Sequence, residues 1–252
     1  MFTSITTPLI ALITALSLVP LSTCIPDQVP DSFLSSEEEV VIPPAVEETA
    51  EYGVPLAGHD AVSDAWFKDA AFIGHSQILG LSEYSGLKTT DYYSLSGSSA
   101  RTIVRSGSVS LPDGEKGTLE YGLSKHSYNK IYLMLGINEI ANDLTWLKVD
   151  YLNFLALVRK YNPNAEIFVL SVIPVTRAKD AGSIYNLKNI HKYNNMLREV
   201  CVEQKCWYID TYEGLADSEG FLPSSDSPDG IHLTVAGYKD LLNYVRTHTL
   251  TK

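Results

Sequence analysis

The sequence predicts an α/β protein: a three-layer α/β/α sandwich in which helices cover both faces of a five-stranded parallel sheet. Two observations support this prediction. Short, almost continuous apolar runs alternate with longer amphipathic stretches from about residue 64 onwards, and such runs are typical of strands buried on both faces. The stretches between them are long enough for right-handed helical crossovers, which join parallel strands.

Five segments have the composition of buried strands, and six have helical periodicity. The expected strands are 70–74, 91–95, 130–135, 166–172 and 206–210, and the expected helices are 76–84, 99–106, 116–127, 143–161, 184–204 and 234–248. The clearest helix is 143–161, in which apolar residues recur at three- and four-residue steps. Asn142 or Asp143 is its expected N-cap, and the proline at 163 ends it.

Residues 1–23 are typical of an export signal. They contain no charged side chain, and an apolar stretch runs from Leu9 to Val19. As a helix this stretch would rise about 16 Å, roughly half of a bilayer core, so it is too short to span a membrane. It fits the apolar region of a signal peptide, although the residues before it include no Lys or Arg.

The signal ends in Leu-Ser-Thr-Cys, where the cysteine is Cys24. This end resembles the lipobox of bacterial lipoproteins, in which the cysteine is acylated, except that Thr23 stands where Gly, Ala or Ser is usual. The alternative is ordinary cleavage nearby, with Cys24 removed or idle. We therefore expect a bacterial cell-envelope lipoprotein tethered through Cys24, or otherwise a secreted protein.

Residues 24–60 are expected to form an acidic linker, and residues 61–252 the folded domain. Residues 24–52 carry eight acidic residues, four prolines and no basic residue, a composition that cannot form a core. Most of the net charge of −11 comes from this linker, so the domain itself is close to neutral. The sequence has no basic patch of the kind that would indicate binding to a nucleic acid.

Two cysteines remain in the domain, Cys201 and Cys206. They lack partner His or Cys residues at the spacing of a zinc site. In an exported protein they either form a local disulfide or remain two half-buried thiols, and the sequence leaves both alternatives open.

Polar residues follow the predicted strands, at the sheet edge where ligands bind in parallel α/β proteins. Ser76 follows the first strand, and His232 follows the fifth with Asp229 three residues before it. A serine becomes nucleophilic when a histidine takes its proton and an acid orients that histidine. A turn at 228–230 can fold Asp229 onto one ring nitrogen of His232 and leave the other for Ser76. A solvated aspartate in a helix-entry loop would give the same pattern.

The strand ends also offer donors for the oxyanion that forms when an ester carbonyl is attacked. By position these donors are the backbone N–H of Ser76 at a helix start, the N–H of Gly97 and the side-chain amide of Asn138. Taken singly, Gly97 also fits a plain turn, and Asn138 also fits the capping of a loop.

Together these blocks resemble the SGNH, or GDSL-type, serine hydrolases. The blocks are Phe-Ile-Gly-x-Ser ending at Ser76, then Gly97, Gly-Ile-Asn-Glu at 136–139 and Asp-Gly-Ile-His at 229–232, in the family's order. The resemblance covers about residues 64–248 and implies a flavodoxin-like fold that hydrolyses carboxylic esters. It implies Ser76 as nucleophile, His232 as general base and Asp229 as orienting acid. It also implies an oxyanion hole of Ser76, Gly97 and Asn138.

Two positions depart from the family's pattern. His75 stands where the first block usually has an aspartate, and Glu139 follows Asn138 where an aspartate is usual. Glu139 keeps the charge. For His75 three interpretations stay open: a structural histidine bonded to a neighbouring loop, a residue that tunes Ser76, or a sign of lost catalysis.

These inferences predict an exported esterase or acylhydrolase without a cofactor or metal. The expected substrate is a small ester or an acylated saccharide of the cell envelope or the diet, and the only expected membrane contact is the lipid anchor. The alternative is a non-catalytic carbohydrate- or envelope-binding protein of the same fold. An α/β-hydrolase is excluded because Ile78 stands where its G-x-S-x-G motif needs glycine. Arg177, after the fourth strand, is either a substrate contact or a solvated loop residue.

Overall fold

A seven-stranded sheet forms the centre of the computed structural model, which describes residues 50–251. The strand order is β4-β3-β2-β1-β5-β6-β7, and β2, β1, β5, β6 and β7 pair in parallel. The strands are β1 (Ala70–Gly74), β2 (Asp91–Ser94), β3 (Val109–Ser110), β4 (Lys116–Gly117), β5 (Lys130–Met134), β6 (Glu166–Leu170) and β7 (Trp207–Ile209). The predicted α/β class is therefore confirmed, and its five parallel strands are present.

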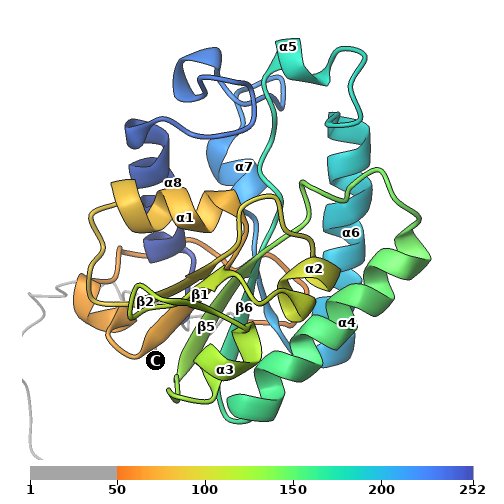
Figure 1. Ribbon diagram of the computed structural model, residues 1–252. Coiled ribbons are helices and arrows are strands. Elements are labelled where there is room, and N and C mark those ends of the chain that lie inside the picture. The colour runs from red at the N-terminus through yellow and green to blue at the C-terminus, as the bar shows by residue number, and fades with distance from the viewer. Residues whose placement is uncertain (1–49, 252) are drawn as a thin grey trace, which may run out of the picture. The chain divides into compact units, whose positions relative to one another are not determined.

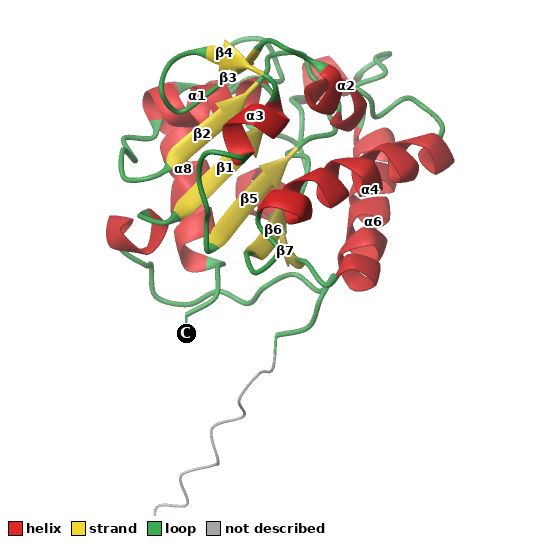
Figure 2. Cartoon of the chain, turned by 60° about the horizontal axis from the view of Figure 1, so that its bottom comes forward, coloured by secondary structure: helices red, strands yellow, loops and turns green. Residues whose placement is uncertain are grey.

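Helices cover both faces of the sheet (Figure 1). The helices are η1 (Asp64–Phe67), α1 (Ser76–Tyr84), α2 (Ala100–Arg105), α3 (Leu119–Leu123), α4 (Leu144–Tyr161), α5 (Arg177–Asp180), α6 (Leu187–Gln204), α7 (Thr211–Leu215), η2 (Ser224–Asp226) and α8 (Val235–Thr247). Helices α2, α3, α4 and α6 pack on one face, and α1, α7 and α8 pack on the other. Figure 2 shows α4 and α6 together on one side of the strands, with α1 and α8 on the other.

Successive side chains of a strand point to opposite faces of the sheet. Helices cover both faces, so the central strands are apolar on both. In β1, Ala71 and Ile73 face the α4 side, whereas Phe72 faces the α8 side. Phe72 stacks on Tyr132 of β5, and Tyr132 stacks on Phe168 of β6, with ring centroids 4.6 Å apart in each pair. Continuous apolar runs in the sequence thus correspond to strands buried in the middle layer.

The edge beyond β2 differs from the prediction. Strands β3 and β4 form a short antiparallel hairpin that extends the sheet to seven strands, and the expected helix 116–127 is reduced to α3. A Pro112-Asp113-Gly114 turn causes this difference, since the N–H of Leu111 donates to the carbonyl of Glu115 across it (2.9 Å). Asp113 closes the turn by accepting from the N–H of Glu115 (3.0 Å).

The folded domain begins before the expected boundary at residue 61. Leu56 is buried, and its N–H donates to the carbonyl of Tyr208 in β7 (3.0 Å). The expected signal, Cys24 and most of the acidic linker lie outside the described residues. No helix in the described part of the chain is long and apolar enough to cross a membrane.

Cys201 and Cys206 are free and buried. The two cysteines therefore do not form the disulfide that the sequence left open. Their thiols are fully buried, whereas the other alternative had them half-buried. Burial raises the pKa of both thiols. They pack within the core on the α6 side of the sheet, where thiols behave as small apolar side chains.

Candidate active site

The predicted site residues gather at the carboxyl edge of the parallel strands. Strands β1 and β5 are neighbours, but α1 after β1 lies on one face of the sheet and α4 after β5 lies on the other. The connections therefore diverge between these strands, which leaves the crevice where ligands bind in doubly wound sheets. Ser76 begins α1 at this crevice, and Asn138 lies in the connection from β5 to α4.

Ser76 is placed at the crevice by the residue that ends β1. A Cβ added at Gly74 would lie 2.1 Å from the carbonyl oxygen of Met134 in β5. Only glycine allows this close approach of the two strands. The helix that carries Ser76 thus starts directly beside β5, and the Ser76 side chain is only partly buried.

Ser76, His232 and Asp229 form a continuous hydrogen-bonded chain. The hydroxyl of Ser76 lies 2.9 Å from Nε2 of His232, and Nδ1 of His232 lies 2.7 Å from Oδ2 of Asp229. The carboxylate accepts only, so Nδ1 carries the proton and Nε2 is left to accept from Ser76. The geometry is that of a serine nucleophile with its base and orienting acid.

The turn from Asp229 to His232 is organised locally. Oδ1 of Asp229 accepts the N–H of Ile231 (3.0 Å) and of His232 (2.8 Å). Burial alone would raise the pKa of the Asp229 carboxyl, but hydrogen bonds from the His232 ring and from these two N–H groups lower it to about 2. Asp229 therefore stays ionised at any pH near neutrality and holds one orientation of the imidazole.

The three predicted oxyanion donors lie in the separate connections that follow the neighbouring parallel strands β1, β2 and β5. In the described part of the chain, the backbone N–H groups of Ser76 and Gly97 donate to no other group. Gly97 has a φ of +72°, a conformation that favours glycine. One N–H of the Asn138 amide donates to the carbonyl of Ser98 (2.9 Å), which orients the amide and leaves its second hydrogen free.

His75 is a buried N-cap of α1. Its side chain is 2% exposed, and its Nδ1 accepts the N–H of Gln77 (3.2 Å). Burial, and then the nearby His232, lower the pKa of His75 to about 3. The ring is therefore neutral, and it satisfies a helix N–H, which is what an aspartate at this position would also do.

Two contacts near the site were not predicted from the sequence. Gln77 is buried, and its Nε2 donates to the carbonyl of Ile231 (2.7 Å), so it joins the helix of Ser76 to the turn of His232. The carboxylate of Glu139 is buried and accepts from the N–H of Ala100 (3.1 Å) and from Tyr193 (3.0 Å). Neither contact has a signal in the sequence, because each joins segments that only the fold brings together.

Arg177, for which the sequence left a substrate contact or a solvated loop residue open, pairs with two residues of the connection after α7. Its guanidinium forms an ion pair with Glu219 and lies 4.3 Å from the ring centroid of Phe221. In the described residues, no three His, Cys, Asp or Glu side chains are grouped so that they could hold a metal ion.

Comparison with known proteins identifies the family of the chain. The model of the GDSL-like lipase/acylhydrolase family matches residues 76–239, more than half of the chain. No curated protein matches the chain.

Several solved structures share the fold. One is a Streptococcus pneumoniae protein provisionally described as a platelet activating factor, with 21% identity over 72% of this chain and 88% of that chain (TM-score 0.56). A GDSL-like lipase from Bacteroides thetaiotaomicron has 15% identity over 72% and 88% of the two chains (TM-score 0.53). An acetyl xylan esterase has 14% identity over 70% and 96% (TM-score 0.50). At these identities the similarity establishes the fold alone.

Proposed function

The chain belongs to the GDSL-like lipase/acylhydrolase family and is a carboxylic ester hydrolase, and from this premise we propose that it cleaves its ester with a Ser76–His232–Asp229 triad. The observation that carries the proposal is the pair of contacts on His232, 2.9 Å to the Ser76 hydroxyl and 2.7 Å to Asp229. No other histidine in the described residues is hydrogen-bonded to a serine in this way.

In the first step the Ser76 oxygen attacks the ester carbonyl carbon while Nε2 of His232 takes the hydroxyl proton. The carbonyl oxygen becomes an oxyanion, which the N–H groups of Ser76 and Gly97 and the free amide hydrogen of Asn138 stabilise. The protonated His232 then gives its proton to the departing alcohol, and an acyl-serine remains.

In the second step a water molecule attacks the acyl-serine. His232 accepts a proton from the water and later returns one to the Ser76 oxygen as the acid leaves. Asp229 stays ionised throughout and stabilises the imidazolium that forms in each half of the reaction.

The test is hydrolysis of p-nitrophenyl acetate by the purified domain and by Ser76→Ala. We expect Ser76→Ala to lose at least about 10³-fold in kcat and to lose labelling by a fluorophosphonate probe. Ser82→Ala is the matched control, because Ser82 lies in the same helix and its hydroxyl bonds only to the carbonyl of Leu79. A wild-type protein that neither hydrolyses any ester of a panel nor reacts with the probe would instead be a non-catalytic binding protein.

We further propose that the protein acts outside the cytoplasm, tethered through an acylated Cys24, on short acyl groups such as acetyl carried by a saccharide. The export signal and the cysteine that ends it support the location, and the acetyl xylan esterase among the structural neighbours supports the substrate. Cys24→Ser should move the full-length protein from the membrane fraction to the soluble fraction. If it leaves the partition unchanged, the tether is not Cys24.

A further inference from the structure

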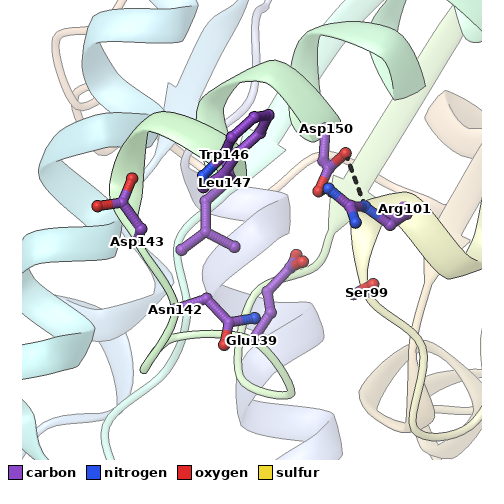
Figure 3. A pocket seen from close by; sticks show the side chains of 8 residues that line it. All are labelled: Ser99, Arg101, Glu139, Asn142, Asp143, Trp146, Leu147 and Asp150. Carbon is purple, nitrogen blue, oxygen red and sulfur yellow. Dashed lines mark hydrogen bonds and ion pairs between the residues drawn. The ribbon is translucent and has the colours of Figure 1, made fainter.

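A pocket of about 500 Å³ opens where the N-terminal ends of α2 and α4 meet the connection after β5 (Figure 3). The triad does not contribute to its lining, and of the sequence blocks that predicted the site only the one at 136–139 reaches it, through Glu139. The residues that line the pocket are Ser99, Arg101, Glu139, Asn142, Asp143, Trp146, Leu147 and Asp150. They come from the start of α2, from the connection after β5 and from the first two turns of α4.

The pocket shares its wall with the loops that carry two oxyanion donors. Ser99 directly follows Ser98, whose carbonyl accepts from the amide of Asn138. Glu139 directly follows Asn138, and its buried carboxylate holds the start of α2 through the N–H of Ala100. A substrate whose carbonyl oxygen lies against Asn138 can therefore extend into this pocket, because the pocket begins at the next residue, Glu139.

Trp146 gives the pocket an apolar surface that the fold does not use. Its side chain is 65% exposed, the largest exposed fraction among the large apolar residues of the described chain. Its indole N–H has no partner there, whereas Trp66 and Trp207 both donate from their indoles to another side chain. An indole that is open on its face and at its N–H suits a ligand with apolar C–H groups beside hydroxyls.

Polar planar groups surround Trp146. Nε of Arg101 donates to both oxygens of Asp150 (3.0 and 2.9 Å), and in the described residues the terminal guanidinium nitrogens donate to nothing. The Asn142 side chain lines the pocket and has no partner in the described chain either. Figure 3 shows both side chains on the border of the open space, across from Trp146. Such a set both donates to and accepts from hydroxyl groups.

The charges restrict the ligand further. Three carboxylates, of Glu139, Asp143 and Asp150, line the pocket against the single guanidinium of Arg101. An anionic group would meet net repulsion there, whereas a neutral hydroxylated ligand would not.

We propose that this pocket is a subsite for a neutral sugar residue, which stacks on Trp146 and donates and accepts hydrogen bonds at Arg101, Asn142 and Asp150. The proposal rests on the proposed function, in that the sugar is joined to the acyl group that Ser76 removes. The substrate class is thus an acylated neutral saccharide, and the sugar next to the scissile ester fills the pocket.

The test compares a large and a small substrate in Trp146→Ala. With an O-acetylated xylo-oligosaccharide we expect KM to rise about tenfold, which corresponds to about 1.4 kcal/mol. With ethyl acetate, whose alcohol part is much smaller than a sugar ring and cannot fill the pocket, kcat and KM should stay within twofold of wild type. Trp146→Phe should recover part of the loss because it keeps an aromatic face. Val149→Ala is the control, since Val149 is exposed on the same helix but lies outside the pocket.

Three results would overturn the subsite. In the first, Trp146→Ala leaves the oligosaccharide KM unchanged. In the second, it slows both substrates equally, as a general disturbance of α4 would. In the third, it weakens hydrolysis of p-nitrophenyl octanoate and not of the saccharide, which would make the pocket an acyl site.

The subsite can also be tested without turnover. Binding of the deacetylated xylo-oligosaccharide to Ser76→Ala, followed by calorimetry and by tryptophan fluorescence, should be lost in the Ser76→Ala, Trp146→Ala double variant. An oligogalacturonide of equal length should bind at least tenfold more weakly, and equal binding would contradict the charge argument. If wild type hydrolyses no ester, the proposed function fails, while this binding experiment still decides the subsite.

Discussion

Ser76 stands between two regions that are built in opposite ways. On the side we call the bonded side, the N–H of Gln77 donates to His75, the Gln77 amide donates to the Ile231 carbonyl, and Asp229 accepts from the ring and the N–H of His232. On the open side, Gly97 and Asn138 lie in exposed connections and keep hydrogen atoms without an acceptor. The difference shows that the His232 turn is already held in place by hydrogen bonds, whereas the donors of Gly97 and Asn138 are available to a substrate. Changes on the bonded side should alter the orientation of His232, and changes on the open side should alter the stabilisation of the oxyanion.

The largest effect on activity is expected from a change on the bonded side, at Asp229. In Asp229→Asn the amide can donate to Nδ1 of His232, so the ring takes the tautomer whose Nε2 cannot accept the Ser76 proton. We expect kcat for p-nitrophenyl acetate to fall about 10³- to 10⁴-fold with KM little changed. Asp226→Asn, a nearby carboxylate that bonds to the Ser225 hydroxyl, is the control. A loss below tenfold would show that Asp229 does not orient His232.

The second-largest effect is expected from a change on the open side, at Asn138. Asn138→Ala removes one oxyanion donor and should lower kcat about 10²- to 10³-fold. The melting temperature should change little because Asn138 is exposed and, within residues 50–251, its side chain bonds only to the Ser98 carbonyl. Asn195→Ala, an exposed asparagine on α6, should match wild type. Equal losses in stability and activity would argue that Asn138 only closes a loop.

The third prediction tests whether Gln77 is a positioning residue that acts through His232. Gln77→Met keeps the length and volume but removes the bond to the Ile231 carbonyl, which leaves the His232 turn less firmly held. We expect kcat to fall about tenfold while KM stays constant, since the group acts through His232 and not on the substrate. An unchanged kcat with a lower melting temperature would assign Gln77 to stability alone.

The smallest effect on activity is expected at His75, where the readout is stability against pH. The folded-state pKa of His75 is about 3 and its ordinary value is 6.5, so below pH 6.5 the unfolded chain binds the extra proton. Stability should therefore decline as the pH falls from 6.5 towards 3, by up to about 1.4 kcal/mol per pH unit from this group.

His75→Asn tests this expectation, because its Oδ1 can still accept the Gln77 N–H while no titrating ring remains. Urea unfolding at pH 7 and pH 5 should show a smaller loss in the variant than in wild type, and kcat should stay within about threefold. Parallel pH profiles for the two proteins would contradict the buried neutral histidine.

Much of the site could be read from the chain because its parts are local. The alternation of apolar runs and helices predicted the parallel sheet, and the sheet predicted where Ser76, Gly97 and Asn138 would lie. Asp229 and His232 are three residues apart, so one turn is enough to join them. The hairpin of β3 and β4 was missed because its strands are only two residues long, too short for a periodic pattern.

The remaining features depend on contacts between distant segments, which periodicity and turn chemistry do not encode. Ser76 and His232 are 156 positions apart in the sequence. The 2.9 Å distance between the Ser76 hydroxyl and Nε2 of His232 follows from the strand order and from the packing of α1 beside the turn at 229–232. The same packing decided that His75 caps a buried helix end and that Gln77 reaches Ile231. It also left Trp146 open beside the oxyanion loops. The residue types and their local turns were thus determined by the sequence, while their distances, burial and pKa values were decided by tertiary structure, because those depend on which segments the core brings together.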